Sequence, residues 1–427
     1  MTPAPRTPLG ALAFVAGVGL IVAVGLALRV GDWRAVGDTG AGLGPDAREY
    51  LTIARQMKGF YWPSYREPLH PALIRVATWL VGPGERAPRL VSISFSSLLV
   101  LVTALVGWRL YGKWPALAAS AFVAVHPYYL YSSTEGVRLE LYSVLLLSFV
   151  WLTSDNRSGR PSLRLIVAGA VAGLLGLTRM TSVVFVVPVL GWFVTKSPTS
   201  KGRTPQCSEE VHRRPASCDL QPETLAPEQH RGSVRSAALV ALLLAAMMIA
   251  PYLYVCHRYL GDSMIWINRH ATWWYHRELQ QKQPGADTGQ KLAPSPAPAG
   301  RPHGTVTVGE YLLGRRSPSE YLLQTLRGYK EIGRILTRIF ATERFYWLTV
   351  WLGWLACAGL ARSLWRGLRL PVLTALLSLL PVSFVVPLGA NPRLFLHVLP
   401  LWVMWSAWGM AWPLEALRRG KVGSDDA

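Results

Sequence analysis

The sequence predicts an all-α, polytopic membrane protein with about ten transmembrane helices and further helices beside the membrane on its outer face. Of the 427 residues, 51% are hydrophobic and 16% are charged, and the mean hydropathy is +0.25. A soluble domain usually carries about a quarter charged residues. The apolar residues also form blocks long enough to cross a bilayer, and basic clusters separate these blocks.

Each apolar block is expected to form a helix, because a backbone inside lipid must satisfy its own hydrogen bonds. The first block lacks a clear cleavage site, which favours a retained anchor over a removed signal peptide. In chain order the predicted spans are Leu9–Val30, Arg89–Leu110, Pro115–Tyr131, Leu141–Thr153, Leu165–Thr178, Thr181–Val194, Ala237–Val255, Phe345–Ala361, Pro371–Leu388 and Leu394–Trp412. The segment Pro68–Gly82 is short and contains Arg75, so we expect it to lie at the interface or to be re-entrant.

The connections between these spans alternate in basic charge, which predicts the topology. If the N-terminus is cytoplasmic, every second connection should be rich in Lys and Arg. The clusters fall at 109–113, 157–164, 196–235, 362–369 and 418–421. The other short connections hold one Arg each, namely Arg138, Arg179 and Arg393. Both chain ends are therefore expected inside, and the net charge of +20 reflects topology and anionic lipid rather than nucleic acid.

The chain is predicted to contain two membrane modules. The N-terminal module, residues 1–194, includes a first outer loop at 31–88, and a polar cytoplasmic linker follows at 195–236. Residues 237–417 hold the remaining spans and a large outer loop at 257–343, and residues 418–427 form a cytoplasmic tail. Within the large loop we expect a flexible insert at 280–304 and an amphipathic interfacial helix at 320–340.

Ionisable residues also occur on the outer side, where the positive-inside rule does not call for them. Since such groups are costly near membrane depth, a shared polar cavity is the economical explanation. They are Asp46, Arg48, Glu49, Arg66, Glu67, Glu135, Arg138, Glu140, Arg179 and Arg393, with His70, His126, His257 and His397 as neutral neighbours. Simpler roles stay open: Arg138 with Glu140 could anchor a lipid headgroup, and Arg179 could snorkel at its span end.

Asp46 stands out because it is not at a span end. Pro45–Asp46 precedes a helical run, so Asp46 is predicted to cap a helix at Ala47–Lys58, which would hold its carboxylate in a fixed orientation. Glu49 follows at the spacing of a capping box and is predicted to be structural.

The absence of several sequence motifs leaves some classes of enzyme without support. The sequence contains no P-loop, no G-x-G-x-x-G, no H-E-x-x-H and no G-x-S-x-G, and its four cysteines show no zinc-ligand spacing. A carboxylate base beside cations suits transfer from a phosphate-linked donor, because the base accepts a proton while the cations stabilise the leaving phosphate. Trp273 and Trp274 fit an interfacial aromatic belt, with stacking on a sugar as the alternative.

Six segments resemble glycosyltransferases of the GT-C superfamily that use lipid-linked sugars, especially lipid A aminoarabinose transferases and protein O-mannosyltransferases. The segments "GPDAREYLTIARQM", "REPLHPALI", "PRLVSISFSSLLVLVTALVGWRLYG", "EGVRLELYSVLLL", "AGLLGLTRMTSVVFVVP" and "NPRLFLHVLP" occur in the family's order. The resemblance covers residues 9–194 and 371–412. It implies a sugar donor on a polyprenyl phosphate and inversion at the anomeric carbon.

The resemblance also implies roles for individual residues. Asp46 matches the acidic residue that acts as base or binds the acceptor, and Glu140 matches a second acidic position. Arg179 and Arg393 match basic positions near the lipid phosphate. Ala47 stands where the family often has a second acidic residue, so no cofactor is assigned and a divalent metal stays an open alternative. With the outer-side charges, the predicted site comprises the catalytic residues Asp46 and Glu140 and the substrate-binding residues Arg48, Arg66, His70, Glu135, Arg138, Arg179, Arg393 and His397.

We therefore expect a glycosyltransferase in a bacterial inner membrane, with its site facing the periplasm or exterior. Its partners would be a polyprenyl-phosphate sugar, a glycolipid, glycan or protein acceptor, and membrane lipids. The alternatives are a transporter or flippase of lipid-linked glycans, which internal repeats and midplane charges would favour, and a non-catalytic envelope scaffold without a cavity at Asp46.

Overall fold

The computed structural model describes residues 8–36, 43–154, 161–195, 226–282, 306–313, 317–339, 346–388 and 394–422. Within these ranges the chain forms helices and no strand. Four of the helices are long and apolar enough to cross a membrane, or five if the bent pair α6–α7 counts as one span. The predicted all-α membrane class is confirmed, while the number of crossings stays a prediction.

A helix lies at every block predicted to span. These helices are α1 (Pro8–Val36), α4 (Arg86–Tyr111), α5 (Lys113–Val125), α7 (Leu139–Ser154), α8 (Pro161–Thr178), α9 (Val183–Thr195), α10 (Ala226–Leu260), α14 (Tyr346–Trp365), α15 (Arg369–Ser383) and α16 (Leu399–Val422). Because α10 begins at Ala226, it takes the last part of the predicted linker; residues 196–225 lie outside the described residues, as does most of the predicted insert.

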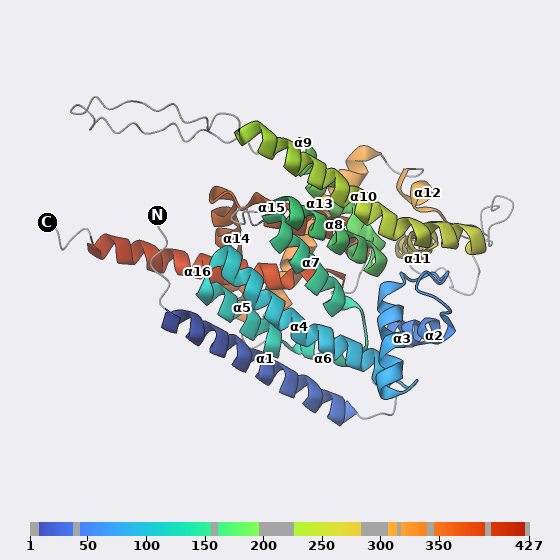
Figure 1. Ribbon diagram of the computed structural model, residues 1–427, viewed down its shortest axis with the longest axis horizontal. Helices are drawn as coiled ribbons and strands as arrows, with labels where there is room; N and C mark the ends of the chain where they lie inside the picture. The colour runs from blue at the N-terminus through green and yellow to red at the C-terminus, as the bar shows by residue number, and fades with distance from the viewer. Residues whose placement is uncertain are drawn as a thin grey trace.

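Shorter helices connect or flank the bundle. They are α2 (Pro45–Gln56), α3 (Leu69–Val81), α6 (Pro127–Glu135), α11 (Ile265–Lys282), α12 (Val308–Leu313) and α13 (Pro318–Ile339), with 3₁₀ turns η1 (Met180–Ser182), η4 (Val386–Leu388) and η6 (Leu396–Val398). In Figure 1 the start of α1 and the end of α16 lie at one end of the bundle, and α2, α3 and α11 lie at the other. Which of these two ends faces the cytoplasm stays a prediction.

The predicted span Pro115–Tyr131 is interrupted in the structure. α5 ends at Val125, and His126 adopts extended backbone angles (φ −66°, ψ 126°) before Pro127 starts α6. A proline disfavours helical geometry in the residue before it and lacks an N–H for the preceding turn. The single predicted helix is therefore two, and α6 leads into the first polar turn of the site.

Gly136 joins α6 to α7, whose axes are bent by 117°. It has left-handed backbone angles (φ 77°, ψ 29°) and ends α6. A Cβ at this position would lie 2.9 Å from Pro88 Cβ and 3.3 Å from Ala47 Cβ. The bend therefore requires glycine for its conformation and for the close approach of α2 and α4, and it brings Arg138 to the same end of the bundle as Asp46.

Gly136→Ala is expected to destabilise the protein by at least about 1–2 kcal/mol, because a left-handed conformation is unfavourable for alanine and its Cβ must displace the neighbouring side chains. The check is thermal unfolding of the purified protein in detergent. Gly191→Ala in α9 is the control: a Cβ there meets nothing within 4 Å, so the change should be neutral or slightly stabilising. Equal unfolding temperatures for Gly136→Ala and wild type would contradict the assigned role of the bend.

The interior of the bundle holds a buried arginine. Arg29 of α1 is 0% exposed; it donates to Ser96 Oγ at 2.7 Å and to the carbonyl oxygens of Val123 and Ala124 at 3.2 and 2.9 Å. The last carbonyls of a helix lack partners within it. Arg29 therefore supplies hydrogen bonds to the last carbonyl groups of α5 and connects α1 and α4 to that end of the helix.

The two halves of the chain meet where α8 packs on α10. A Cβ on Gly169 would lie 2.5 Å from the Ala241 backbone, so the helices approach at backbone contact distance. Small residues permit such approaches in membrane bundles, where dispersion and packing replace the hydrophobic effect. This packing places α10 and the following α11 beside the N-terminal module.

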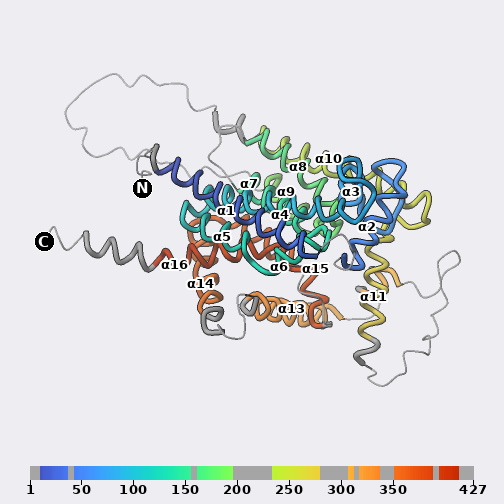
Figure 2. Tube along the Cα trace, turned by 90° about the horizontal axis from the view of Figure 1, so that it is seen from below, coloured from blue at the N-terminus to red at the C-terminus, as the bar shows by residue number. Residues whose placement is uncertain are grey.

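The predicted amphipathic helix is present as α13. Its apolar residues divide between two faces: Ile332 and Leu336 are buried, whereas Leu322 and Leu326 are 62% and 56% exposed. Figure 2 shows α13 along one side of the bundle, and Tyr329 donates to the Leu376 carbonyl of α15. The helix is confirmed, and its place at a membrane interface stays a prediction.

Candidate active site

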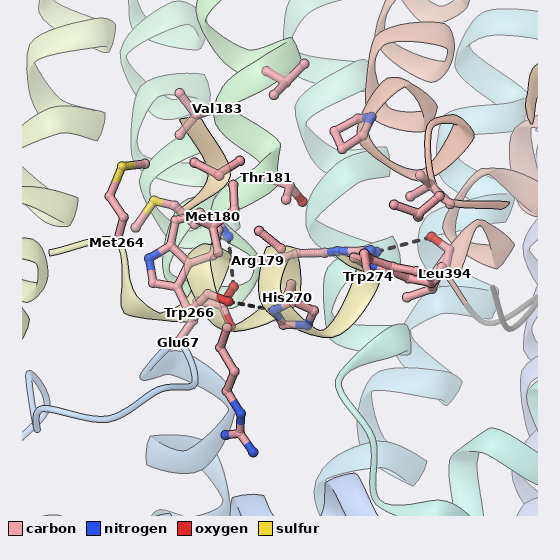
Figure 3. Close-up of a pocket in the computed structure, with 18 of the residues that line it drawn as sticks. Glu67, Arg179, Met180, Thr181, Val183, Met264, Trp266, His270, Trp274 and Leu394 are labelled. Atoms are coloured by element: carbon pink, nitrogen blue, oxygen red, sulfur yellow. Dashed lines mark hydrogen bonds between the residues drawn. The ribbon is translucent and has the colours of Figure 1, made fainter. Parts of the chain in front are cut away.

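A cavity of about 1150 Å³ opens among α2, the start of α7, η1, α10, α11 and the end of α15. One part of its wall is charged, with Asp46, Arg66, Glu67, Arg138 and Arg179. The rest is apolar and aromatic: Val183, Val184, Ile249, Leu253, Trp266, Trp273, Trp274, Val382 and Phe384 contribute to it. Figure 3 shows Glu67, Arg179, Trp266 and His270 around this space. The cavity thus has a charged part and an apolar part.

Arg66 holds two carboxylates of α2 together. Its Nη2 lies 2.7 Å from Asp46 Oδ1, and its Nε donates to Glu49 Oε2 at 2.7 Å. Asp46 and Glu49 are three residues apart and share one helix face. The Asp46 side chain is 53% exposed, against 17% for Glu49. Asp46 is therefore oriented by Arg66 and still accessible from the cavity.

Glu49 also connects α2 to the large outer loop. Its Oε1 accepts from Arg269 Nη1 of α11 at 3.1 Å, and the Arg269 guanidinium lies 4.1 Å from the centre of the Tyr65 ring. Charge alternates along Asp46, Arg66, Glu49 and Arg269. This chain of ion pairs fixes α11 against α2 at the rim of the cavity.

Glu67 forms a second, more buried junction. Its carboxylate is 4% exposed; it pairs with Arg138 through Oε2 and accepts from the Met180 N–H through Oε1 at 3.0 Å. Burial by itself would raise the pKa of Glu67, but the charge of Arg138 and the backbone N–H bonds outweigh burial and hold that pKa below its usual value. The ionised pair therefore fixes the 57–68 loop to the starts of α7 and η1.

Arg179 differs from the other arginines of the cavity. Its Nη1 donates to the Leu394 carbonyl oxygen at 3.2 Å, and its guanidinium lies 5.6 Å from the Tyr142 ring centre. Among the described residues no carboxylate forms an ion pair with it. Burial lowers the pKa of Arg179, yet guanidinium stays charged at neutral pH. The described part of the cavity therefore contains a partly buried cation without a carboxylate partner.

The structure brings four predicted site residues together at the cavity and leaves others outside its wall. Asp46, Arg66, Arg138 and Arg179 line it. Glu140, Glu135, His70 and His397 are buried elsewhere, and Arg48 is exposed on α2 away from the wall. Arg393 lies outside the described residues.

The buried residues have identifiable partners. Glu140 accepts from Ser132 Oγ, His70 Nε2 lies 3.2 Å from the Gly136 carbonyl oxygen, and His397 Nε2 lies 3.3 Å from Ser378 Oγ. Glu135 has its Oε1 close to Gly44. In this structure these four residues join helices within the bundle instead of facing the cavity.

The predicted cap of α2 is wrong in detail. The helix begins at Pro45, its N-cap is Gly44, and no side chain caps it. Pro45 at the first helical position moves the start two residues earlier than predicted, from Ala47 to Pro45. Asp46 therefore lies in the first turn, and Glu49 bonds to Arg66 and Arg269 instead of completing a capping box.

Several cavity residues were not assigned from the sequence. Glu67 was recognised only as an outer charge, although its place beside Arg66 was a usable signal. Arg269, His270 and Trp266 come from the large outer loop, and only the fold of α11 against α2 brings them to the site.

The donor set does not favour a metal site. Among the residues that the structure describes, no three His, Cys, Asp or Glu side chains gather to hold an ion. The nearest carboxylates to the cavity, Asp46, Glu49 and Glu67, are each bonded to a guanidinium. The described residues thus do not fit a divalent cation.

The family comparison supports the predicted resemblance. Residues 64–206 match the model of the dolichyl-phosphate-mannose-protein mannosyltransferase family. An oligosaccharyltransferase from Archaeoglobus fulgidus, solved with an inhibitory peptide and a dolichol-phosphate, superposes with a TM-score of 0.54 at 13% identity over 99% of this chain. The chain has the fold of the GT-C glycosyltransferases.

Other solved structures are also similar to this chain. The same archaeal enzyme with Zn and sulfate superposes with a TM-score of 0.52 at 14% identity over 94% of this chain. ArnT from Cupriavidus metallidurans gives 0.42 at 16% identity, over 93% of this chain and 77% of its own. This chain spans 52% and 49% of the two archaeal chains. No curated protein sequence matches.

Proposed function

We propose that this protein is an integral-membrane glycosyltransferase that moves a sugar from a polyprenyl-phosphate donor to a hydroxyl of an envelope glycolipid, glycan or protein. The observation that carries the proposal is one cavity lined both by the accessible carboxylate of Asp46 and by the guanidinium of Arg179, which has no carboxylate partner among the described residues. The proposal includes a bacterial inner membrane with the cavity on its periplasmic or outer face.

On the donor side, Arg179 offers positive charge to the phosphate. A partly buried cation without a carboxylate partner gains more from an anionic ligand than an exposed one, because less water competes for it. Val183, Val184, Ile249 and Leu253 supply an apolar wall next to Arg179. Phosphate and hydrocarbon are the two chemistries of a lipid-phosphate donor, and the archaeal structure was solved with a dolichol-phosphate.

On the acceptor side, Asp46 is the base. Arg66 engages Asp46 Oδ1, and Oδ2 has no partner among the described residues. Oδ2 takes the proton of the acceptor hydroxyl as that oxygen forms a bond to the anomeric carbon. The bond from that carbon to the phosphate oxygen breaks, and its electron pair leaves on the phosphate, where Arg179 stabilises it. A single displacement inverts the anomeric configuration.

The test is transfer by the purified protein from a panel of radiolabelled polyprenyl-phosphate hexoses, pentoses and amino sugars, with a crude envelope extract as acceptor. We expect label to enter the extract and polyprenyl phosphate to be released for one class of donor. A folded protein that transfers no sugar, in an extract that supports another transferase, would overturn the proposal. Movement of intact donor across proteoliposomes would then favour a flippase.

Arg179→Gln is expected to lower kcat/KM for the donor by about 10- to 100-fold, because the leaving phosphate loses a charge-assisted bond in a desolvated site. Arg179→Lys should recover part of the loss. Initial rates are measured against the donor's mole fraction in mixed micelles, with Arg334→Gln as the control, because Arg334 is an exposed residue of α13. Unchanged kinetics in Arg179→Gln would remove this residue from the phosphate site.

A further inference from the structure

His270 of α11 lines the cavity and takes no part in the mechanism above. Its Nδ1 lies 2.6 Å from the Trp266 carbonyl oxygen, an interaction that Figure 3 also shows. A carbonyl oxygen only accepts hydrogen bonds, so Nδ1 must carry the proton. In the neutral ring Nε2 is then unprotonated, and its lone pair is an acceptor.

The surroundings of His270 keep it in that form. The His270 side chain is exposed to the cavity, and desolvation by the surrounding protein still lowers its pKa; Arg138 and Arg66 lower that pKa further, and the Trp266 carbonyl and Glu67 oppose them without reversing the direction. Arg269 lies beside it on the same helix. The imidazole is therefore neutral at neutral pH, and Nε2 has no protein partner among the described residues.

Nε2 of His270 is an acceptor in a cavity whose charged groups are mostly donors or already bonded, and the other neutral acceptors there include hydroxyls such as those of Tyr65 and Thr181. Arg66, Arg138, Arg179 and Arg269 present only donors, and the carboxylates of Glu49 and Glu67 are occupied by arginines. A sugar carries several hydroxyl groups, each of which needs an acceptor when it leaves water. Asp46 is reserved for the reacting hydroxyl in the proposed mechanism, so another hydroxyl requires another acceptor.

We propose that Nε2 of His270 accepts a hydrogen bond from a non-reacting hydroxyl of the carbohydrate in the cavity and so helps to determine which sugar is used. The inference rests on the proposed function for the identity of the ligand. His270 is thus a specificity-determining residue that selects for a hydroxyl at one position of the sugar.

Kinetics give the first test. His270→Phe keeps a planar ring without an acceptor and should lower kcat/KM by about 10-fold or more, whereas His270→Gln, whose amide oxygen can accept, should recover much of the loss. His276→Phe is the matched control, since His276 is an exposed histidine of the same helix and does not line the cavity. Equal rates for wild type and His270→Phe would overturn the inference.

The pH profile separates recognition from a structural role. A protonated imidazole cannot accept a hydrogen bond, so kcat/KM of the wild type should fall as the pH drops below the usual histidine range. The part of this fall that is caused by protonation of His270 should be absent from His270→Gln, in which Asp46 is unchanged. Singly deoxygenated donors and acceptors locate the hydroxyl: the analogue that lacks the bonded group should be insensitive to His270→Phe. If every analogue is equally sensitive, the residue does not recognise a hydroxyl.

A binding measurement keeps the test independent of turnover. The ¹⁵N resonance of His270 Nε2, assigned by its loss in His270→Gln, should shift when polyprenyl-phosphate sugars are added to Asp46→Asn protein, but not with polyprenyl phosphate alone. A shift only on adding glycolipid acceptor would place the bonded hydroxyl on the acceptor. No shift with either would overturn the inference, whereas a shift without transfer by wild type would count against the proposed function alone.

Discussion

Replacing Asp46 by asparagine is expected to lower the rate of sugar transfer by about 100-fold or more while the protein stays folded. An amide oxygen can still accept from Arg66 but cannot take the proton of the acceptor hydroxyl. Because the Asp46 side chain is 53% exposed and outside the packed bundle, the substitution should cost little stability.

The measurement for Asp46→Asn is the initial rate of transfer from the donor identified by the panel, together with the unfolding temperature. Thr52→Ala is the control, because Thr52 is an exposed residue of the same helix that bonds only to the Arg48 carbonyl. A wild-type rate in folded Asp46→Asn protein would rule out the assignment of this residue as base, even if the cavity binds the donor.

Replacing Glu67 by glutamine is expected to destabilise the protein by about 3–5 kcal/mol, because Arg138 would keep a buried charge without its counter-ion. The loop at 57–68 would also lose charge-assisted bonds to the Met180 N–H and to Arg138. Thermal and denaturant unfolding in detergent give the measurement. Glu331→Gln, which breaks the exposed pair with Arg334 on α13, should change stability by less than about 1 kcal/mol.

The same pair predicts an acid sensitivity. The pKa of Glu67 is lower in the folded protein than its unfolded value of about 4.3. The stabilisation by ionised Glu67 is therefore complete above that unfolded value and is lost as the pH falls through the folded one. Glu67→Gln should be less sensitive to pH in this window than wild type, and equal sensitivity would count against the buried ion pair.

The helices could be predicted well from apolar block length, because lipid imposes helical backbone on each block. The interruption at Pro127 was missed, since the apolar run continues through it and only the proline marks the end of α5. The charged end of the cavity also followed from topology, which places Asp46, Arg66, Arg138 and Arg179 on one side without knowledge of their contacts.

The parts of the site that escaped prediction depend on side-chain direction and distant contacts. Arg138 and Glu140 are two residues apart, and residues at that spacing point to different sides at a helix start; Arg138 reaches the cavity and Glu140 reaches Ser132. Arg269 and His270 belong to a segment whose composition resembles an outer loop. Their role depends on contacts with α2, and Glu49 and Arg269 are 220 residues apart in the sequence.

That separation has a consequence for biogenesis. Ribosomes add roughly 5–20 residues per second, so about 10–45 s pass between the synthesis of Glu49 and that of Arg269. During this interval Glu49 lacks one of its two arginine partners, because Arg269 has not yet been synthesised. The charged rim of the cavity is thus completed in two stages, and a nascent chain stalled before α11 would expose a half-built pocket to the cell's quality-control proteases.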